Sequence, residues 1–515
     1  MKKVFSITAM FLAAMIAVGC GEDDITVIND TTGNTGIDIV ETDTTCDRTI
    51  AIVFSTSSDA TVSNTGDNIS ATVSGNDVTI LNLGTEKVNY QLFGSTTDGY
   101  LKIYSGKKQV VALNDVSIKN TRGAAINVQG AETNPADGKS VTLVLNGSNS
   151  LADGGSYTLT PSNEDEKGVL FCEGKIIVSG SGTLNVNASV DGKKGICSDN
   201  QVVFNGGSTT ITVTGGTVVN NSDTTSTAGV KADEQFIMNA GSLTITNSGK
   251  GGKGISCDGT ANFIGGTVDI TVTGANFGSS SGGYGPGGHG SSSDKSVGAK
   301  GIKCDGNIII SGGIISVKAS NNEGIECKGT MTITGGQTYS QSSDDAINSA
   351  SDMTISGGVV CAYSTGNDGI DANGNCYIQG GVIYAIGKNS PEMAIDANTE
   401  EGKKLYIQGG TIIAIGSLEN GAQLTQACYQ ASSWSKNVWY SITVGEQTYA
   451  FKTPSSGGNK LVVSGSVQPV VNNNVTVSGG TEMCNGMLVD SPTVSGGNSV
   501  NLSNYTSSGG GPGGW

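Results

Sequence analysis

Carboxylate and amide side chains recur on either side of a repeated pair, a small residue followed by isoleucine. The set comprises Glu323, Glu326, Asp344, Asp345, Asn348, Asn367, Asp368, Asp371 and Asp396. If successive repeats stack in register, these oxygen donors lie about 5 Å apart. Carboxylates that close repel one another unless a cation lies between them, and Ca²⁺ prefers about six to eight oxygen ligands. The pattern therefore predicts a Ca²⁺ site, with a solvated acidic face as the alternative.

The preceding repeats carry lysine at the same places, in particular Lys300 and Lys303. Beside Ca²⁺, which could hold a uronate carboxylate, an amine could accept the C5 proton, so both lysines are candidates for the base of a polysaccharide lyase. The alternative is structural, because Glu323 and Glu326 on the next repeat could hold the lysines as ion pairs. Paired lysines have high pKa values and make poor bases.

The repeat that would position these residues runs through residues 161–415. Its isoleucines, from Ile302 through Ile325, Ile347 and Ile370 to Ile395, are 22 to 25 residues apart. Each unit also contains a polar turn, an apolar strand ending in Gly-Gly and a second strand. Short alternating strands at this period indicate a β-solenoid, whereas a β-propeller blade needs about 40–50 residues. We expect an all-β parallel β-helix with β-rich caps and the isoleucines stacked inside.

Composition limits the partners and the chemistry that this chain can have. The net charge is −17 and the chain has two arginines, Arg48 and Arg122, which argues against nucleic acid or anionic lipid as a partner. The cysteines show no zinc-site spacing; Cys304 and Cys327 are expected in the core or in a disulfide. The single histidine, His289, lies in a Gly/Ser-rich loop and lacks the held geometry of a general base.

The N-terminus indicates export. Lys2 and Lys3 precede an apolar run, which is typical of a signal peptide. The predicted segments are 1–19 signal peptide, 20–45 acidic linker, 46–160 N-terminal cap and first turns, 161–415 regular repeats with an insertion at 276–297, 416–505 C-terminal β region or cap, and 506–515 Gly-rich tail.

The end of that run, Ala17-Val18-Gly19-Cys20, resembles a bacterial lipobox, so Cys20 is expected to carry lipid. The acidic residues after Cys20 resemble the tag that sends lipoproteins to the outer face of the outer membrane. An ordinary secretory signal is the alternative. We expect a monomer that is surface-exposed and touches the membrane through this anchor alone.

Several stretches carry a family resemblance. They are residues 88–94, 109–116, 123–126, 157–160 and 179–184, followed by the repeats. Together, over roughly residues 50–470, they resemble a bacterial carbohydrate-binding-domain lipoprotein family with a right-handed parallel β-helix. Members are similar in fold to Ca²⁺-dependent pectate lyases and bind cellulose or pectic polymers with Ca²⁺ on the helix. The resemblance implies the right hand and glycan binding for this chain.

Three functions follow: a polysaccharide-binding protein, a Ca²⁺-dependent lyase, and a structural, adhesin-like surface protein. Binding is favoured by the resemblance and by the lack of any nucleophile set in the repeats. Aromatic residues make up 5% of the chain, and the candidates for stacking on a sugar are Tyr339, Tyr363, Tyr377 and Tyr384. This scarcity favours an acidic glycan bridged by Ca²⁺ over a neutral glycan stacked on aromatic rings, although a cellulosic ligand stays open.

Overall fold

The structure is a computed structural model that describes residues 44–63, 65–130, 140–158, 164–220, 223–278, 296–483, 486–489 and 492–507. The predicted signal peptide, Cys20, most of the linker 20–45, most of the insertion 276–297 with His289, and most of the tail 506–515 lie outside these residues. Within them, no helix is long and apolar enough to cross a membrane.

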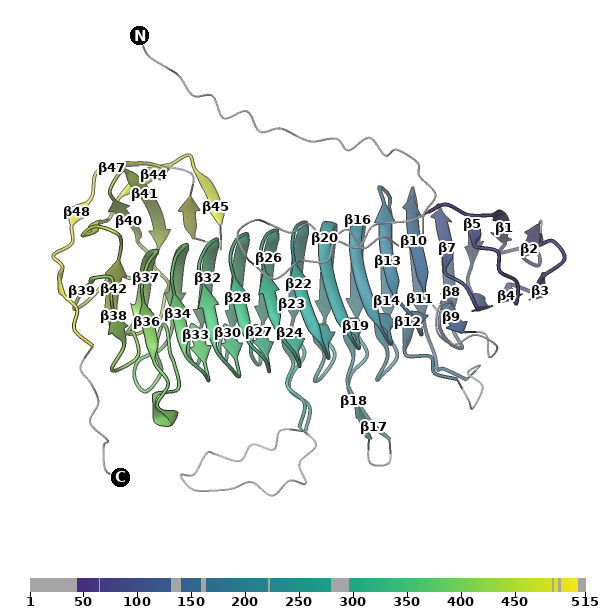
Figure 1. Cartoon of the computed structure of the whole chain (residues 1–515), viewed down its shortest axis with the longest axis horizontal. Coiled ribbons are helices and arrows are strands. Elements are labelled where there is room, and N and C mark those ends of the chain that lie inside the picture. Colours follow the sequence, from purple (N-terminus) through teal and green to yellow (C-terminus); the bar gives the residue numbers. More distant parts are fainter. Residues whose placement is uncertain are drawn as a thin grey trace, which may run out of the picture. The chain divides into compact units, whose positions relative to one another are not determined.

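Strands form almost all of the regular structure, and two large sheets contain most of them (Figure 1). The 12-stranded sheet consists of β3 (Ile69–Ser74), β4 (Asp77–Asn82), β6 (Tyr100–Ser105), β9 (Ile126–Gly130), β12 (Gly168–Cys172), β15 (Lys194–Ser198), β19 (Ala228–Ala232), β21 (Lys253–Cys257), β24 (Lys300–Cys304), β27 (Ile325–Cys327), β30 (Ile347–Ser349) and β33 (Ile370–Ala372).

The second sheet has 27 strands, and most of them lie in two columns of parallel neighbours. The first column contains β5 (Val88–Thr96), β7 (Gln109–Asn114), β10 (Val141–Asn146), β13 (Ile176–Gly180), β16 (Gln201–Val213), β20 (Gln235–Asn247), β22 (Thr260–Phe263), β25 (Ile308–Ile310), β28 (Met331–Ile333), β31 (Met353–Ile355), β34 (Cys376–Ile378), β36 (Leu405–Ile407) and β38 (Gln423–Leu424). The second contains β8 (Ser117–Asn120), β11 (Ser148–Asp153), β14 (Thr183–Ala188), parts of β16 and β20, β23 (Thr267–Val272), β26 (Ile314–Ala319), β29 (Gln337–Ser342), β32 (Val359–Ser364), β35 (Val382–Ile386) and β37 (Thr411–Gly416).

One repeat is therefore a strand of the 12-stranded sheet followed by one strand in each column, as in β24, β25 and β26. Successive repeats pair in parallel, so that Ile302 lies beside Ile325, and Ile347 beside Ile370. Isolated bridges extend this row to Ile395 and Leu418. All of these side chains are buried, because alternation along each strand sends them to the inside. The predicted isoleucine row is confirmed.

Parallel pairing runs through the segment 46–160, for which the sequence predicted an N-terminal cap and first turns. Strand β1 (Arg48–Phe54) pairs in parallel with β5, and β4 pairs in parallel with β6. Among the described residues of this segment, the antiparallel pairs are β1 with β2 (Thr61–Ser63) and β3 with β4. Most strands of the segment thus belong to the stack.

The C-terminal region is antiparallel. Its strands are β39 (Cys428–Ala431), β40 (Trp439–Val444), β41 (Gln447–Lys452), β42 (Lys460–Ser464), β43 (Val470–Asn473), β44 (Thr476–Ser478), β45 (Thr481–Met483), β46 (Met487–Val489), β47 (Thr493–Ser495), β48 (Asn498–Ser499) and β49 (Ser503–Asn504). Strand β42 pairs with β37, and β40 and β41 belong to a separate six-stranded sheet. Two small elements, the strand pair β17 (Val218–Asn220) and β18 (Asp223–Thr225) and the 3₁₀ helix η1 (Thr399–Glu401), complete the described structure.

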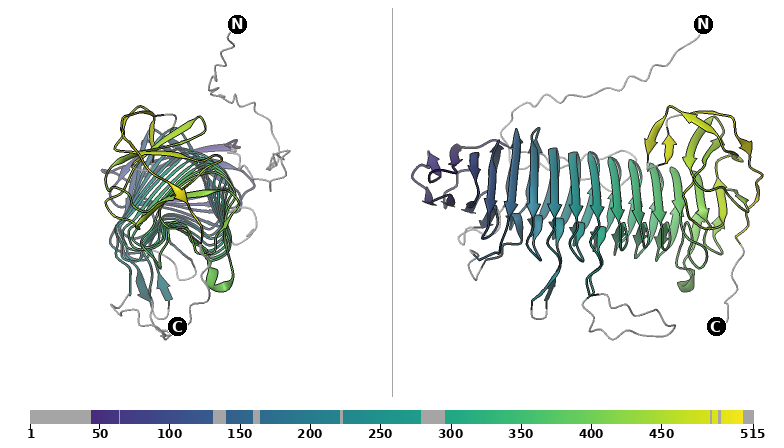
Figure 2. Two further views of the ribbon diagram at one scale, coloured as in Figure 1. Left: turned by 90° about the vertical axis from the view of Figure 1, so that its left-hand side faces the viewer. Right: turned by 180° about the vertical axis from the view of Figure 1, so that it is seen from behind.

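The six-stranded antiparallel sheet lies beside the last repeats (Figure 2). Ile442 and Phe451 share one buried cluster with Tyr384 and Ile413. The outward face of β32, β35 and β37 is apolar, and an exposed apolar patch of that kind is stabilised by a covering element. The region 416–505 therefore covers a side of the stack instead of serving simply as an end cap.

The predicted fold class, a right-handed parallel β-helix with β-rich caps, is corrected by these findings. The chain is all-β, but its parallel strands close around the core like a barrel with extra strands, and not as a regular solenoid with a cap at each end. The physical reason lies at the two ends. The N-terminal strands continue the parallel pairing, and the C-terminal strands bury the outward apolar face.

The two cysteines for which a disulfide was open, Cys304 and Cys327, are adjacent in register but are free thiols. The Cys304 thiol donates to the main-chain oxygen of Gly259 at 2.9 Å. Both side chains are buried, so they belong to the core, as small apolar residues do.

The paired glycines allow the repeats to approach closely at the turns. Gly336 has a φ of 72°, and a Cβ placed there would lie 2.7 Å from the carbonyl carbon and oxygen of Gly312 in the previous repeat. Gly402, after η1, has a similar φ of 78° but nothing within 4 Å of its Cβ position. Both positions therefore require a left-handed backbone conformation, but only at Gly336 would a Cβ atom overlap neighbouring atoms.

We expect Gly402→Ala to lower the free energy of unfolding by about 1–2 kcal/mol, the cost of a left-handed conformation for an L-residue. Gly336→Ala should lower it by on the order of 2 kcal/mol more, because the added methyl group also overlaps main-chain atoms. Thermal and denaturant unfolding of the two variants measures the difference. Equal destabilisation would show that the repeats do not approach as closely as described.

Candidate functional site

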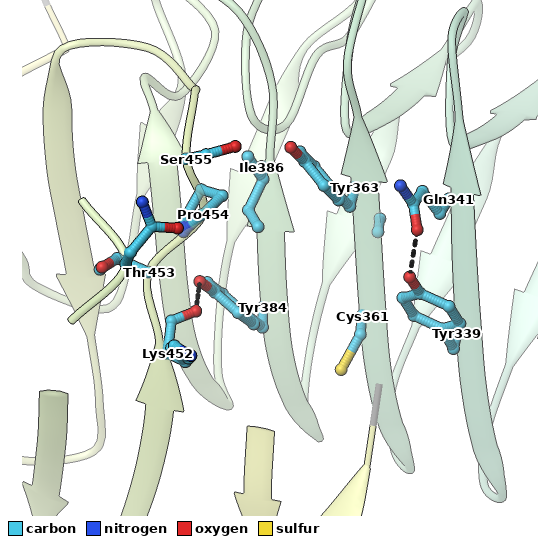
Figure 3. A pocket seen from close by; sticks show the side chains of 12 residues that line it. Tyr339, Gln341, Cys361, Tyr363, Tyr384, Ile386, Lys452, Thr453, Pro454 and Ser455 are labelled. Atoms are coloured by element: carbon cyan, nitrogen blue, oxygen red, sulfur yellow. Dashed lines mark hydrogen bonds between the residues drawn. The ribbon is translucent and has the colours of Figure 1, made fainter. Parts of the chain in front are cut away.

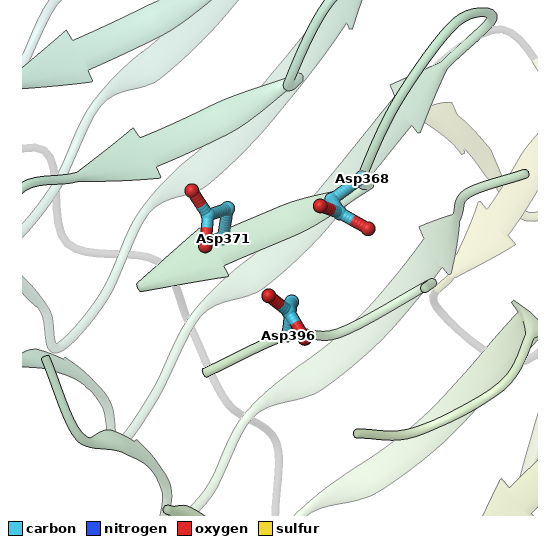
Figure 4. Close-up of side chains that lie close together, drawn as sticks. All are labelled: Asp368, Asp371 and Asp396. Atoms are coloured by element: carbon cyan, nitrogen blue, oxygen red, sulfur yellow. The ribbon is translucent and has the colours of Figure 1, made fainter. Parts of the chain in front are cut away.

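Three aspartates converge at the end of the 12-stranded sheet. Asp368 lies in the turn before β33, Asp371 lies within β33, and Asp396 follows Ile395, which bridges to Ile370. One carboxylate oxygen from each lies within 4.8 Å of the others. Figure 4 shows the three side chains turned toward a common space. The register of the repeats thus brings together carboxylates that are up to one full repeat apart in the sequence.

An amide connects this cluster to the preceding repeat. The Nδ2 atom of Asn348 donates to Oδ2 of Asp371 at 2.6 Å and to Oδ2 of Asp345 at 3.1 Å. The other oxygen of Asp345 accepts from the main-chain nitrogen of Asp368 at 3.1 Å. Oδ1 of Asp368 accepts in turn from the main-chain nitrogen of Met393. We call Asp345, Asp368, Asp371 and Asp396 the acid cluster.

Asp344 and Asn367 lie beside the acid cluster and form their own hydrogen bond. The Nδ2 atom of Asn367 donates to Oδ1 of Asp344 at 2.9 Å. The Asp344 carboxylate is close enough to raise the pKa values of Asp345 and Asp371. Asp344 therefore extends the region of negative charge by one place on the turn side, and Asn367 holds its carboxylate through the hydrogen bond.

Two further acids at the cluster escaped the sequence interpretation. Glu419 is buried, accepts from Oγ1 of Thr399 at 2.8 Å and is hydrogen-bonded to Asp396. Glu392 lies close enough to raise the pKa of Asp368. Ser417-Leu418-Glu419 repeats the pattern of small residue, apolar residue and acid, and Leu418 pairs with Ile395. That pattern was a usable signal beyond the predicted end of the repeats at residue 415.

Burial is the largest cause of the raised carboxyl pKa values in the acid cluster, and repulsion between neighbouring acids adds to it. These effects raise the pKa of Asp345 to about 8, of Asp368 to about 7 and of Asp371 to about 6. The pKa of Asp396 is also raised, by burial and by sharing a hydrogen bond with Glu419. Among the described residues, no lysine or arginine forms an ion pair with these four carboxyl groups.

Glu323 and Glu326 lie on the repeat before Asp345 and have cationic partners. The Lys300 ammonium lies 3.1 Å from Oε1 of Glu323 and 2.5 Å from Oε2 of Glu326. Lys328 also pairs with Glu326. The structure therefore pairs these two glutamates with lysines. The acid cluster, whose carboxyl groups have no such partner among the described residues, begins on the next repeat with Asp345.

The two lysines proposed as bases are both engaged. The pKa of Lys300 is raised by Glu323 and Glu326 despite its burial, so its amine stays protonated at neutral pH. Lys303 forms an ion pair with Asp305 at 2.5 Å. The structural alternative, an ion pair of lysine with glutamate across repeats, is confirmed for Lys300.

Three of the four candidate tyrosines line a separate cleft of about 260 Å³. Tyr339 and Tyr384 flank Cys361 in one outward row, and Tyr363 lies between Gln341 and Ile386 in the next. The last residue of β41 and the segment after it, residues 452–455, form the opposite wall (Figure 3). Tyr377 lies elsewhere, with its ring stacked on Tyr406 at 4.9 Å between centroids. The sequence could not reveal this cleft because five of its twelve described lining residues come from the C-terminal region.

Comparison with known proteins gives a partial match. A sequence-family model described as carbohydrate-binding domain-containing protein matches residues 74–212 and 267–346, less than half of the chain. The predicted resemblance is confirmed to the extent that a carbohydrate-binding family is supported. The lipoprotein features stay predictions. No curated protein matches the sequence.

A solved structure described as the polysaccharide lyase-like protein from C. thermocellum, a gadolinium derivative, is 21% identical to this chain. The alignment covers 55% of this chain and 91% of that protein, with a TM-score of 0.35. A similarity this low carries no argument about fold or activity.

The acid cluster predicts an unusual dependence of stability on pH in the absence of metal. A carboxyl group whose pKa is higher in the folded state binds its proton more tightly there, so stability falls as pH rises from the unfolded pKa, about 4, to the folded pKa. For Asp371, Asp368 and Asp345 the folded values are about 6, 7 and 8. In EDTA, we expect the melting temperature to fall between pH 5 and pH 8.

Differential scanning calorimetry in EDTA at several pH values measures this trend. Asp345→Asn should flatten it, whereas Asp269→Asn, a change at an exposed aspartate of β23, should leave it unaltered. A melting temperature that is constant or rises over this interval would contradict the described electrostatics.

The ion pairs of Glu326 predict that two lysine substitutions differ in their effect on the free energy of unfolding. Glu326 is 2% exposed, so removing a partner leaves a poorly solvated charge. Lys300→Met should lower the free energy of unfolding by about 3 kcal/mol. Lys303→Met, which removes a more exposed pair, should cost about 1 kcal/mol or less. Urea unfolding compares them, and similar values would show that Lys328 alone compensates Glu326.

Proposed function

We propose that this protein binds an acidic polysaccharide through Ca²⁺ held at the acid cluster. The observation that carries the proposal is the packing of four largely buried carboxyl groups with no lysine or arginine paired to them among the described residues. Their donor atoms are all oxygen, the ligand type that Ca²⁺ prefers. The donor set therefore fits this cation.

Ca²⁺, when bound, would supply positive charge that the protein carboxylates and a glycan carboxylate can share. The residues of the chain have distinct tasks around it. Asp368, Asp371 and Asp396 would provide carboxylate ligands. Asn348 holds Asp345 and Asp371 in fixed orientations through its amide hydrogen bonds. Pre-oriented ligands lose less conformational entropy when the cation binds.

The family match supports carbohydrate as the general ligand. The acidic character of the glycan rests on the cluster itself, because an uncharged sugar would gain less from a cation shared with the protein. Export and anchoring through Cys20 are proposed from the sequence. They would place a monomeric glycan-binding protein at the cell surface.

A lyase is the less favoured function. Neither Lys300 nor Lys303 is a free amine, since each is paired with a carboxylate. Lys253 has a pKa lowered to about 7 by burial and by the nearby Lys303 and Lys300, but its side chain is buried and donates to the main-chain oxygen of Gly251. A general base must reach the proton that it abstracts. We expect no unsaturated uronate product from acidic polysaccharides in the presence of Ca²⁺.

The proposal predicts that Asp371→Asn and Asp396→Asn lower Ca²⁺ affinity by at least tenfold, because each removes a charged ligand. The exposed Asp269→Asn is the matched control and should bind Ca²⁺ as the unaltered protein does. Isothermal titration calorimetry measures the affinity. Ca²⁺ should also raise the melting temperature, since a ligand that binds the folded state alone stabilises it.

Glycan binding is tested by pull-down with polygalacturonate and alginate, each with Ca²⁺ or with EDTA. Binding in Ca²⁺ that disappears in EDTA and in Asp371→Asn supports the proposal. An unchanged melting curve in EDTA together with no bound metal would overturn it. Formation of unsaturated uronate would replace binding by lyase activity as the function.

A further inference from the structure

We propose that the cleft between the last repeats and the C-terminal region binds an uncharged sugar residue, independently of Ca²⁺. The cleft is defined by Tyr339, Gln341, Tyr363 and Tyr384 on one wall and by Asn437 and residues 452–455 on the other. This cleft is separate from the proposed cation site, because no residue of the acid cluster lines the cleft.

The C-terminal wall is held in place by one of the tyrosines. The hydroxyl of Tyr384 donates to the main-chain oxygen of Lys452 at 2.9 Å (Figure 3). The ring of Tyr384 packs on Phe451, with 5.3 Å between centroids. These contacts place the end of β41, and with it the start of the segment that follows, opposite the outward rows of the repeats. The cleft is therefore a built feature in which each wall has its own structural support.

The aromatic wall offers a ring that is not fully covered. Tyr339 and Tyr384 are buried, at 8% and 4% exposure, whereas Tyr363 is only partly buried. In Figure 3 its ring lies between Ile386 and Gln341. A pyranose ring presents apolar C–H groups on its faces, and a partly exposed aromatic ring is a suitable surface for them.

Polar groups around that ring have unused hydrogen-bonding capacity. Oε1 of Gln341 accepts from the hydroxyl of Tyr339 at 2.7 Å, which leaves the Nε2 atom of Gln341 as a donor. The hydroxyls of Tyr363 and Ser455 and the side-chain amide of Asn437 have no hydrogen-bond partner among the described residues. Sugar hydroxyl groups both donate and accept, so this set of amides and hydroxyls can pair with them.

Asn437 is tied to the segment that follows β41. The main-chain nitrogen of Asn437 donates to the main-chain oxygen of Pro454 at 3.3 Å. Its φ of 56° is a left-handed conformation that asparagine adopts more readily than most residues. Both residues line the cleft, so this hydrogen bond holds the parts of the C-terminal wall together.

The lining determines the class of ligand. Among the described residues that line the cleft there is no carboxylate, and Lys452 is the one charged residue. Aromatic, amide and hydroxyl groups are the typical partners of an uncharged sugar. The volume of about 260 Å³ lies just below the usual range for small-molecule sites, about 300–1,000 Å³. The cleft therefore fits one hexose residue, as at a chain end or branch, better than a longer segment.

Most of the cleft lies outside the residues that match the carbohydrate-binding family. Tyr339 and Gln341 lie within the match, whereas Tyr363, Tyr384 and the whole C-terminal wall lie beyond it. The inference consequently rests on the geometry of this chain and not on the family.

The test measures binding of neutral oligosaccharides of glucose, galactose, mannose and xylose to the full mature chain in EDTA, by isothermal titration calorimetry. Galacturonate oligosaccharides form the charged arm. Tyr363→Ala should lower affinity for the bound neutral sugar at least tenfold. Tyr363→Phe, which keeps the ring, should lower it only a few-fold. Tyr100→Ala, at a partly buried tyrosine of β6 outside the cleft, is the matched control and should bind as the unaltered protein does.

Circular dichroism and Ca²⁺ titration of each variant establish that the fold and the cation site are retained. Loss of neutral-sugar binding in Tyr363→Ala alone, with Ca²⁺ affinity unchanged, supports the cleft even if the cation site fails its own test. The proposal is overturned if no neutral sugar binds, if Tyr363→Ala binds normally, or if Tyr100→Ala loses binding instead. Preference for galacturonate that is lost in Lys452→Gln would overturn the assignment of an uncharged ligand.

Discussion

Parallel main-chain pairing in register is the interaction on which the rest of this structure depends. Each repeat hydrogen-bonds to the next, so equivalent side chains stand about 4.8 Å apart. For apolar side chains this proximity is favourable. Ile302 and Ile325 are buried side by side, and Phe204, Phe236 and Phe263 follow one another with ring centroids 6.0 and 5.4 Å apart. The same spacing is unfavourable for charged side chains of one sign, and the acid cluster is where that conflict is strongest.

In the repeats from Lys253 to Asp368, one charged residue stands directly before the small residue that precedes the isoleucine. The row formed by these residues shows how the chain lowers the repulsion between like charges. Lys253 and Lys300 are neighbours in register, and burial with nearby ammonium groups lowers the pKa of Lys253 to about 7. Lys300 is instead neutralised by Glu323 and Glu326, where the row changes sign. Beyond that point, no lysine or arginine of the described residues forms an ion pair with the acid cluster. A proton or a bound cation is then the remaining way to lower the repulsion.

Sequence reasoning found the inward rows and the acids because both follow from a single short period. The isoleucine row, the convergence of Asp368, Asp371 and Asp396, and the pairing of Lys300 with Glu326 all depend on the register between adjacent repeats. Glu419 was within reach of the same logic, since Leu418 continues the isoleucine row. It was missed because the strand after Leu418 no longer shows the Gly-Gly turn that marks the other repeats.

The fold class and the cleft could not be predicted from the repeat period, because both depend on contacts between the repeats and the C-terminal strands. The strands of the C-terminal sheet are antiparallel and have no common spacing, so nothing in their sequence states which surface they cover. The apolar residues that they bury alternate with inward ones in the same strands, as Tyr384 alternates with Ile383 and Ala385. In a strand with both faces buried, alternation of polar and apolar residues is lost.

The relation between the two candidate sites follows from the same geometry. Tyr363 is near the end of β32, and the turn that follows it carries Asn367 and Asp368 to the acid cluster. In that turn the hydroxyl of Ser364 accepts from the main-chain nitrogen of Asn367 at 2.7 Å and donates to the oxygen of Asp344 at 2.7 Å. A short, internally bonded turn thus separates the aromatic ring from the carboxylates. Because it fixes both, a glycan that reaches the cleft and a cation in the cluster would meet residues held by one rigid element and not by a mobile loop.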